Sequence, residues 1–304
     1  MLTLIARRIV RLAVVLAGVS VVTFAILHVS GDPVALMMPE APEADRAALR
    51  LAMGFNDPLT VQFGRFVASI ARGDFGKSFF HRAPALPLVL ERMPTTLLLT
   101  VLAMALSLVL AVPLGIVSAV RRNSVIDHGA TFVVFLGTSM PVFWTGIMLM
   151  LLFAVRLRLL PVSGWDSWAA LILPAITLAS ASTPLLLRIV RSSMLDVINL
   201  DYVRTARAKG VSEWLVICHH ALVNAALPLV TVAGLQFGLL LGGAIITETV
   251  FAVPGVGRLI VGAIRQLDFP IVQAGVFVFA LIVVLVNFAV DLLYIYLNPQ
   301  IRVR

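Results

Sequence analysis

Charged residues are scarce in this sequence. Asp, Glu, Lys and Arg make up 12% of its 304 residues, whereas 61% are hydrophobic and the mean hydropathy is +1.05. A soluble domain of this length could not bury so much apolar surface. The composition therefore excludes a soluble globular protein and indicates an all-α polytopic membrane protein.

Cysteine and histidine are also rare. The single cysteine, Cys218, excludes an internal disulfide. His219 and His220 are adjacent, so on a helix they would point about 100° apart and could not both bind one metal ion. The contexts of Ser192 and Ser193 do not resemble a nucleophile elbow. We therefore expect no catalytic residue, no metal site and no cofactor bound by this chain.

Long apolar runs dominate the sequence instead. Six stretches approach the roughly 20 residues that cross about 30 Å of hydrocarbon, and they are 9–29, 96–119, 131–155, 169–190, 228–250 and 274–296. The first ends at "HVSGDP" without a small-residue cleavage site, so we interpret it as an uncleaved signal-anchor helix. We therefore expect an N-terminal transmembrane helix (1–30), an extracytoplasmic loop subdomain (31–95), a five-helix core (96–296) and a cytoplasmic tail (297–304).

The distribution of positive charge orients the spans. With the N-terminus inside, the inner segments carry twelve Lys or Arg residues, namely Arg7, Arg8, Arg11, Arg121, Arg122, Arg188, Arg191, Arg204, Arg207, Lys209, Arg302 and Arg304. The two short outer loops carry four, namely Arg156, Arg158, Arg258 and Arg265. This asymmetry predicts that both termini are cytoplasmic. Because the charge lies at span ends, membrane topology rather than nucleic-acid binding explains the net charge of +8.

One segment of the outer loop resembles a phosphate-binding loop. In "ARGDFGKSFF", Gly76, Lys77 and Ser78 match the end of that motif, but Ala71 stands where the motif requires glycine. The topology also places the segment outside, away from cytosolic nucleotide. We therefore expect a turn ahead of an interfacial segment.

Three features inside the spans stand out. The fifth span carries glycines at four-residue intervals, which form a groove for packing within the bundle or against a second subunit; they are Gly234, Gly238 and Gly242. Glu248 lies at the outer end of the same span and is interpreted either as a gate or cavity-lining residue or as a partner of Arg258 or Arg265. Pro141 is one of several prolines that predict kinked helices lining a cavity.

The longest inner loop, 191–227, contains the polar stretch "DYVRTARAKG" at 201–210. Asp201 is a good N-cap, and Gly210 is placed to end the helix in a left-handed C-cap, with Lys209 near the negative helix end. Helical spacing puts one apolar face on this segment (Tyr202, Val203 and Ala206) and one basic face (Arg204 and Arg207). A second helix should start near Ser212 and end at Pro228. The short helix would either dock on a partner or rest on anionic lipid.

The sequence around this loop resembles a known family. "DYVRTARAKGVSEWLVICHHALVNAALPLVT" is similar to the cytoplasmic loop of ABC-importer permeases that serve dipeptides, oligopeptides, glutathione and nickel chelates. The resemblance continues in "SGDPVAL", "GDFGKSF", "LGTSMPVFW", "RSSMLDV", "ETVFAVPGVGRL" and "DLLYIYLNPQIR". The general importer pattern has Glu-Ala-Ala before its glycine, where Arg204, Thr205 and Ala206 stand here, and its glycine lies closer to the proline that matches Pro228. The contacts of that glutamate therefore do not carry over.

The resemblance implies a fold and a set of partners. It implies the type I ABC-importer permease fold with six transmembrane helices, in a bacterial inner membrane, paired with a second, similar permease. Two cytosolic ATPase subunits, which bind ATP and Mg²⁺, and an extracytoplasmic solute-binding protein complete such importers. The helix 202–209 would seat on an ATPase, through a coupling loop comprising Asp201, Tyr202, Arg204, Ala206, Arg207, Ala208, Lys209 and Gly210.

The resemblance also ranks the functions. It implies import of di- and oligopeptides by a subunit that is not itself an enzyme, with glutathione or nickel and other metal chelates as alternative cargoes. An ion-coupled secondary transporter is the alternative from another class. That alternative predicts inverted repeats with broken helices and acidic relays within the spans, and the sequence shows neither.

Overall fold

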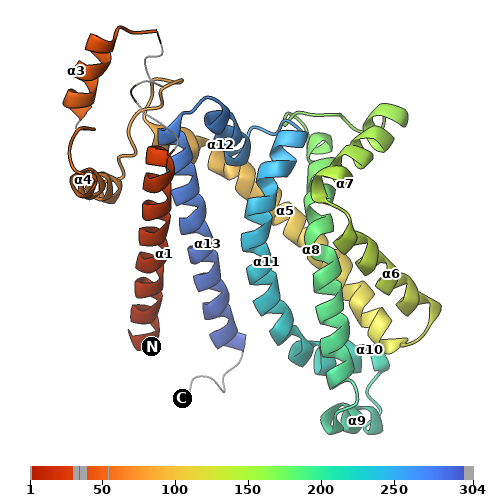
Figure 1. The fold of residues 1–304 in the computed structure, drawn as a ribbon. Coiled ribbons are helices and arrows are strands. Elements are labelled where there is room, and N and C mark those ends of the chain that lie inside the picture. Colours follow the sequence, from red (N-terminus) through yellow and green to blue (C-terminus); the bar gives the residue numbers. More distant parts are fainter. Residues whose placement is uncertain (1, 30–33, 35–39, 54, 298–304) are drawn as a thin grey trace. The chain divides into compact units, whose positions relative to one another are not determined.

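The computed structural model describes residues 2–29, 34, 40–53 and 55–297, and these residues are almost entirely helical (Figure 1). The described part contains one isolated antiparallel bridge, between Lys77 and Pro84. The chain divides into two compact units, the first made of residues 1–94 and 255–284 and the second of 95–254 and 285–304. The expected tail lies outside the described residues, apart from its first position.

The first unit contains α1 (Leu2–Val29), α3 (Glu43–Met53), α4 (Leu59–Ala71), α12 (Val256–Arg265) and most of α13 (Phe269–Leu297). The ring of Phe24 on α1 lies 5.3 Å from that of Phe63 and 5.7 Å from that of Phe66, both on α4. These aromatic contacts hold the amphipathic α4 against the apolar α1.

The segment that resembles a phosphate-binding loop is a structural turn of this unit. The buried Asp268, which precedes α13, accepts hydrogen bonds from the Ser78 hydroxyl and from the backbone amides of Phe79 (3.2 Å) and Phe80 (3.3 Å). Gly76 has a φ of 83°, which glycine adopts without strain. Because Asp268 occupies the hydroxyl and two of the local amides, these groups are committed to anchoring the outer segment.

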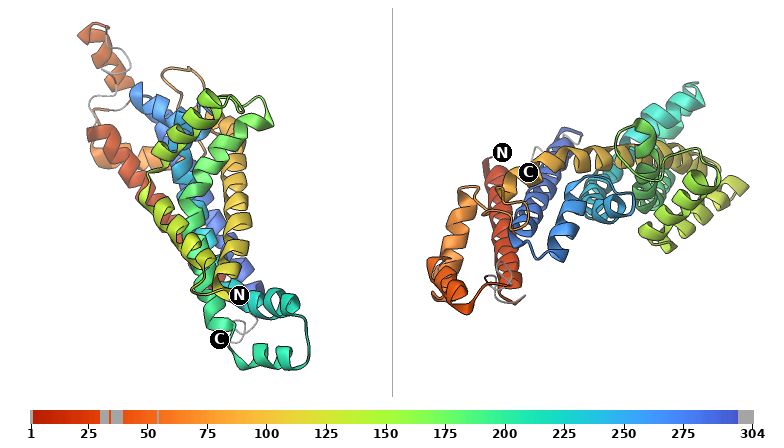
Figure 2. Two further views of the ribbon diagram at one scale, coloured as in Figure 1. Left: turned by 90° about the vertical axis from the view of Figure 1, so that its right-hand side faces the viewer. Right: turned by 90° about the horizontal axis from the view of Figure 1, so that it is seen from above.

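The second unit is built around α8 (Trp168–Val197). It also contains most of α5 (Ala85–Val120), α6 (Val125–Ser139), α7 (Val142–Leu149), α9 (Asp201–Ala208), α10 (Glu213–Leu215), α11 (Leu222–Val250) and two π-helical segments, η1 (Met150–Arg156) and η2 (Val216–Ala221). The most apolar window of α8 is 67% buried, against 33% for that of α5. Figures 1 and 2 show α6 and α11 on different sides of α8.

Glycines bring the neighbouring helices close to α8. A Cβ atom added at Gly115 of α5 would lie 2.7 Å from Val190 of α8, and one at Gly137 of α6 would lie 2.5 Å from Pro184. Small residues allow helix backbones to approach where lipid supplies no hydrophobic drive for association. The core of this unit therefore depends on the absence of side chains at these two positions.

Among the described residues, four helices are long and apolar enough to cross a membrane: Ala85–Val120, Trp168–Val197, Glu213–Val250 and Phe269–Val290. The α6 and α7–η1 pair passes the same test only together and would make a fifth span. The described apolar part of α1 is the shorter Leu12–Ile26. The structure thus has helices at all six expected positions, with two corrections to their form.

The third expected span is not one kinked helix. Its two halves are bent by 106° between Ser139 and Val142, as Figure 1 shows for α6 and α7. Pro141 occupies the N-cap of α7, where its fixed φ and missing amide suit a helix start but not a helix interior. The fifth expected span also differs, because Pro228 lies inside a helix that runs on from Glu213 to Val250.

Candidate functional site

The loop expected to couple to a partner is an ordered helix–turn–helix between α8 and α11. Its helix α9 runs over Asp201–Ala208 and lies beyond the end of α8 in Figures 1 and 2. The expected N-cap is wrong by one residue: Leu200 is the cap and makes no side-chain cap bond. Asp201 is instead the first helical residue, where its carboxylate favours the positive helix end and lies 3.7 Å from Arg204.

Gly210 ends α9 as the sequence predicts. Its φ is 78°, in the left-handed region. The Gly210 amide donates to the Arg207 carbonyl (2.9 Å) and the Val211 amide to the Ala206 carbonyl (3.3 Å), which is the Schellman arrangement. This turn reverses the chain, so that α10 starts beside the end of α9.

Arg207 fastens the two sides of the turn together. Its Nη2 lies 2.8 Å from Glu213 Oε1 and its Nε lies 3.1 Å from Oε2, while Nη1 donates to the Ile198 carbonyl at 3.3 Å. The hydrogen bond to Glu213 raises the pKa of Arg207 above its ordinary value. Arg204 is exposed, whereas Arg207 is engaged within the loop, so the two arginines of the expected basic face have different contacts.

One face of α9 is buried against the following segment. Val203 is fully buried and Ala206 nearly so, in the same apolar cluster as Val216 and Ala221 of η2. Burying a side chain such as Val203 stabilises by about 1.5–3 kcal/mol. Tyr202 is half exposed, and its hydroxyl accepts a hydrogen bond from Asn224 at 3.0 Å.

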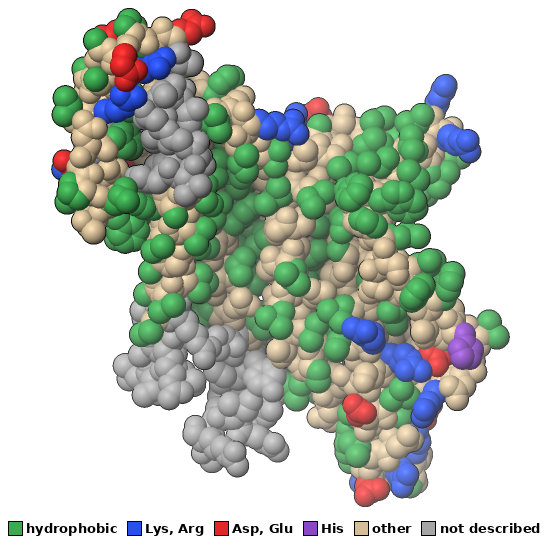
Figure 3. Space-filling view, in the orientation of Figure 1, with side chains coloured by type: hydrophobic (Ala, Val, Ile, Leu, Met, Phe, Trp, Pro, Cys, Tyr) green, Lys and Arg blue, Asp and Glu red, His purple; other side chains and the backbone are tan. Residues whose placement is uncertain are grey.

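The opposite face of α9 is exposed in the part of the chain that the structure describes. The side chain of Asp201 is 99% exposed and that of Arg204 is 68% exposed. We define the docking face as the exposed residues Asp201, Arg204, Thr205, Ala208 and Lys209. Figure 3 shows charged side chains gathered at this end of the second unit, beside an apolar band over its spans.

The structure therefore separates the expected loop residues by role. Ala206 and Arg207 hold the loop together, whereas Asp201, Arg204, Ala208, Lys209 and Gly210 reach solvent. Sequence reasoning missed Glu213, the partner of Arg207, and Trp214, which is 74% exposed beside the turn. Glu213 carried no signal because the reversal at Gly210, and not helical spacing, brings it to Arg207. Trp214 could have been noted from the sequence, because a large aromatic residue stands directly after the polar segment 201–210.

The expected glycine groove of α11 is split. Gly234 packs on α13, where an added Cβ would lie 2.5 Å from Val290. Gly238 is half-buried, and Gly242 is exposed with nothing within 4 Å of an added Cβ. Gly234 therefore serves packing within this chain, and Gly242 does not.

The two candidate gate residues lie in different settings. Glu248 is fully buried near the end of α11, and its carboxylate accepts a hydrogen bond from the Thr96 hydroxyl of α5 at 2.6 Å. Pro141 is exposed at the bend between α6 and α7. A gating role for either residue stays a prediction. Within the described ranges no group of three or more metal-binding side chains occurs.

The apolar helices define a polytopic α-helical membrane protein. Its 191–227 loop has a fixed structure, with a left-handed turn at Gly210, the Arg207–Glu213 ion pair and one exposed face of α9. Comparison with known proteins then identifies the family. The model of the binding-protein-dependent transport system inner membrane component matches residues 111–303, and the model of its N-terminal part matches residues 1–100. The chain belongs to this family: it is the permease subunit of an ABC importer and not an enzyme, since the ATPase is a separate subunit.

Relatives match over the whole chain. The glutathione transport system permease protein GsiC of Salmonella typhimurium is 42% identical over 306 residues, with 100% of both chains covered. The dipeptide transport system permease protein DppB of Escherichia coli K12 is 40% identical over 337 residues, with 99% of both covered. A chain of the inward-facing MetNI methionine ABC transporter covers 69% of this chain and 96% of its own length, at 20% identity and a TM-score of 0.58. That likeness supports the ABC-importer permease fold, of type I.

Proposed function

We propose that this chain carries short peptides across the bacterial inner membrane, with di- and oligopeptides as the main cargo and glutathione as the second candidate. The observation that carries the proposal is the end-to-end similarity to both a dipeptide and a glutathione permease, at 40% and 42% identity. Glutathione is itself a short peptide, so the two relatives share one cargo chemistry. Selectivity within that class is set mainly by the extracytoplasmic binding protein.

The proposed energy source is a pair of cytosolic ATPase subunits that bind ATP and Mg²⁺. A second, similar permease and a solute-binding protein complete the proposed complex, and both termini of this chain face the cytoplasm. ATP binding draws the ATPases together, the docking faces follow, and the bundles rock between inward-open and outward-open states. The exposed docking face on α9, held rigid by Gly210 and Arg207, supports this proposal, because a lever has to be stiff and accessible.

Uptake by the purified complex in proteoliposomes tests the cargo. Radiolabelled alanyl-alanine and glutathione are offered with the binding protein outside and ATP inside, and a protonophore is added to a parallel sample. We expect ATP-dependent dipeptide uptake that the protonophore leaves unchanged. Faster uptake of glutathione than of dipeptide would assign the second cargo. Uptake that needs an ion gradient and no ATP would contradict the proposal.

A further inference from the structure

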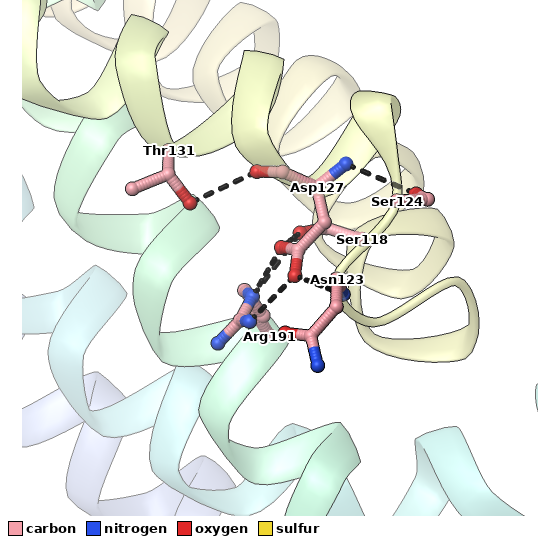
Figure 4. A network of polar contacts seen from close by, with 6 residues as sticks. All are labelled: Ser118, Asn123, Ser124, Asp127, Thr131 and Arg191. Atoms are coloured by element: carbon pink, nitrogen blue, oxygen red, sulfur yellow. Dashed lines mark hydrogen bonds and ion pairs between the residues drawn. The ribbon is translucent and has the colours of Figure 1, made fainter.

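An ion pair with a buried carboxylate links α6 to the end of α8, at the start of the 191–227 loop. Arg191 Nε lies 2.7 Å from Asp127 Oδ1, and Arg191 Nη2 lies 2.8 Å from Oδ2. The guanidinium therefore donates to both carboxylate oxygens in a bidentate pair (Figure 4). The Asp127 side chain is 4% exposed and that of Arg191 is 28% exposed. Bidentate pairs of this kind fix orientation as well as distance.

The same carboxylate also accepts hydrogen bonds from the end of α5 and from the turn that follows it. The Ser118 hydroxyl, on the last turns of α5, donates to Asp127, and the Asn123 amide donates to Asp127 Oδ2 at 2.9 Å (Figure 4). Asn123 has a φ of 62°, an uncommon conformation for a residue other than glycine. Ser124 caps α6 by accepting a bond from the Asp127 amide at 3.3 Å. One side chain thus joins α5, the connecting turn and α6 to Arg191 of α8.

Close packing beside the pair restricts sliding between the helices. Gly115 of α5 meets Val190, the neighbour of Arg191, and Gly137 of α6 meets Pro184, both with too little space for a methyl group. Arg191 lies in the last two turns of α8, and α9 begins at Asp201. The end of α8 nearest α9 is therefore in contact with both α5 and α6.

Stability alone is a weak reason for such a pair, because apolar residues of similar volume often stabilise a buried position as well or better. A bidentate pair adds a fixed orientation between the two side chains, which apolar contacts define less strictly. We propose that Asp127 and Arg191 are positioning residues that make α5 and α6 move with α8 when the 191–227 loop is displaced. This proposal rests on the proposed function, in which partner ATPases displace the loop.

The test compares three variants in the reconstituted complex, with copurification of the partners, ATP hydrolysis and cargo uptake measured on each. In Arg191→Met the Asp127 carboxylate is buried without its cation, and we expect poor recovery of the complex. In the double variant Asp127→Leu, Arg191→Met the lone charge is removed, and we expect recovery and hydrolysis to return. Uptake per ATP hydrolysed should still fall, by about tenfold, since coupling networks of this kind carry that order of effect.

Arg191→Lys keeps the charge but cannot form the bidentate pair. We expect normal recovery of the complex and a smaller loss of uptake per ATP than in the double variant. Arg65→Met is the matched control, because it breaks an exposed ion pair (Arg65–Asp57, 2.6 Å) in the first unit and should change nothing. Wild-type uptake per ATP in the double variant or in Arg191→Lys would overturn the proposal. Failure of the wild-type complex to transport with ATP would instead contradict the proposed function, so the two failures are distinguishable.

Discussion

The guanidinium of Arg207 and the carboxylate of Glu213 meet across the reversal at Gly210, with Nη2 2.8 Å from Oε1. This contact closes a small loop whose inner face is apolar and whose outer face is open to a partner. The docking face therefore depends on three local features: the left-handed turn at Gly210, the Arg207–Glu213 ion pair and the buried side chain of Val203. Each can be tested separately.

Breaking the ion pair should uncouple the complex with little loss of stability. The side chains of Arg207 and Glu213 are 35% and 54% exposed, and exposed pairs contribute about 0–1 kcal/mol. For Arg207→Ala we expect nearly unchanged thermal unfolding but uptake reduced by about twofold to tenfold. The exchange Arg207→Glu, Glu213→Arg should restore part of the uptake. Arg65→Ala, which breaks the exposed pair with Asp57 in the first unit, is the control. Equal uptake in Arg207→Ala and wild type would show that the Arg207–Glu213 pair does not hold the loop for coupling.

Substitutions at Gly210 should be graded by backbone preference. Nothing lies within 4 Å of an added Cβ there, so the cost is conformational, about 1–2 kcal/mol for most residues in the left-handed region. We expect coupled uptake to fall in the order Gly210→Asn, Gly210→Ala, Gly210→Val. Gly210→Pro should be worst, because it also removes the amide bonded to the Arg207 carbonyl. Gly129→Ala, at an open position inside α6, is the control: it should leave coupled uptake unchanged while raising helix stability slightly. Normal uptake in Gly210→Pro would contradict the proposal that the turn at Gly210 is needed for α9 to couple ATP hydrolysis to uptake.

The glycines of α11 should differ sharply from one another. Gly234→Ala places a methyl group against Val290 and should destabilise the chain by about 1–3 kcal/mol, as overpacking does. Gly242→Ala meets open space and should leave the melting temperature in detergent unchanged. If the exposed Gly242 position contacts the second permease, Gly242→Leu will lower copurification of that subunit without lowering the melting temperature. Equal melting temperatures for Gly234→Ala and Gly242→Ala would show that the α11–α13 packing is not as described.

Local chemistry explains why much of this loop could be predicted from the sequence. The helix at 201–208 and the left-handed turn at Gly210 follow from helical spacing and from a glycine after a lysine, which act over a few residues. The bend at Pro141 was expected only as a kink, because the angle depends on what the two halves pack against. Pro228 did not end its helix: the expected second helix and the fifth span form one helical segment from Glu213 to Val250.

Contacts between residues far apart in the chain could not be predicted from the sequence. Asp127 and Arg191 are 64 positions apart, and a single sequence holds nothing that pairs one buried acid with one of many arginines. Glu248 was expected to line a cavity or to meet an arginine, and the contact to Thr96, 152 positions away, could not be predicted from either role. Buried carboxylates are hydrogen-bonded, but hydropathy does not reveal which donors they meet.

Membrane orientation can be checked with a charged thiol reagent that does not cross the bilayer. Cys218 is first replaced by serine, and single cysteines are introduced as Arg82→Cys and Arg204→Cys, both at exposed positions. We expect Arg82→Cys to react in intact cells and Arg204→Cys to react only after permeabilisation. The opposite pattern would invert the proposed topology.

Crosslinking from two neighbouring positions of α9 tests the central claim most directly. Ala208 is exposed on the docking face, whereas Ala206 is 7% exposed and faces Val216 and Ala221. In the cysteine-free chain carrying Ala208→Cys, a short bifunctional reagent should link the permease to an ATPase subunit of the intact, ATP-hydrolysing complex. Ala206→Cys should give little product. No crosslink from Ala208→Cys in an active complex, or a stronger one from Ala206→Cys, would contradict α9 as the site where the energy of ATP enters this subunit.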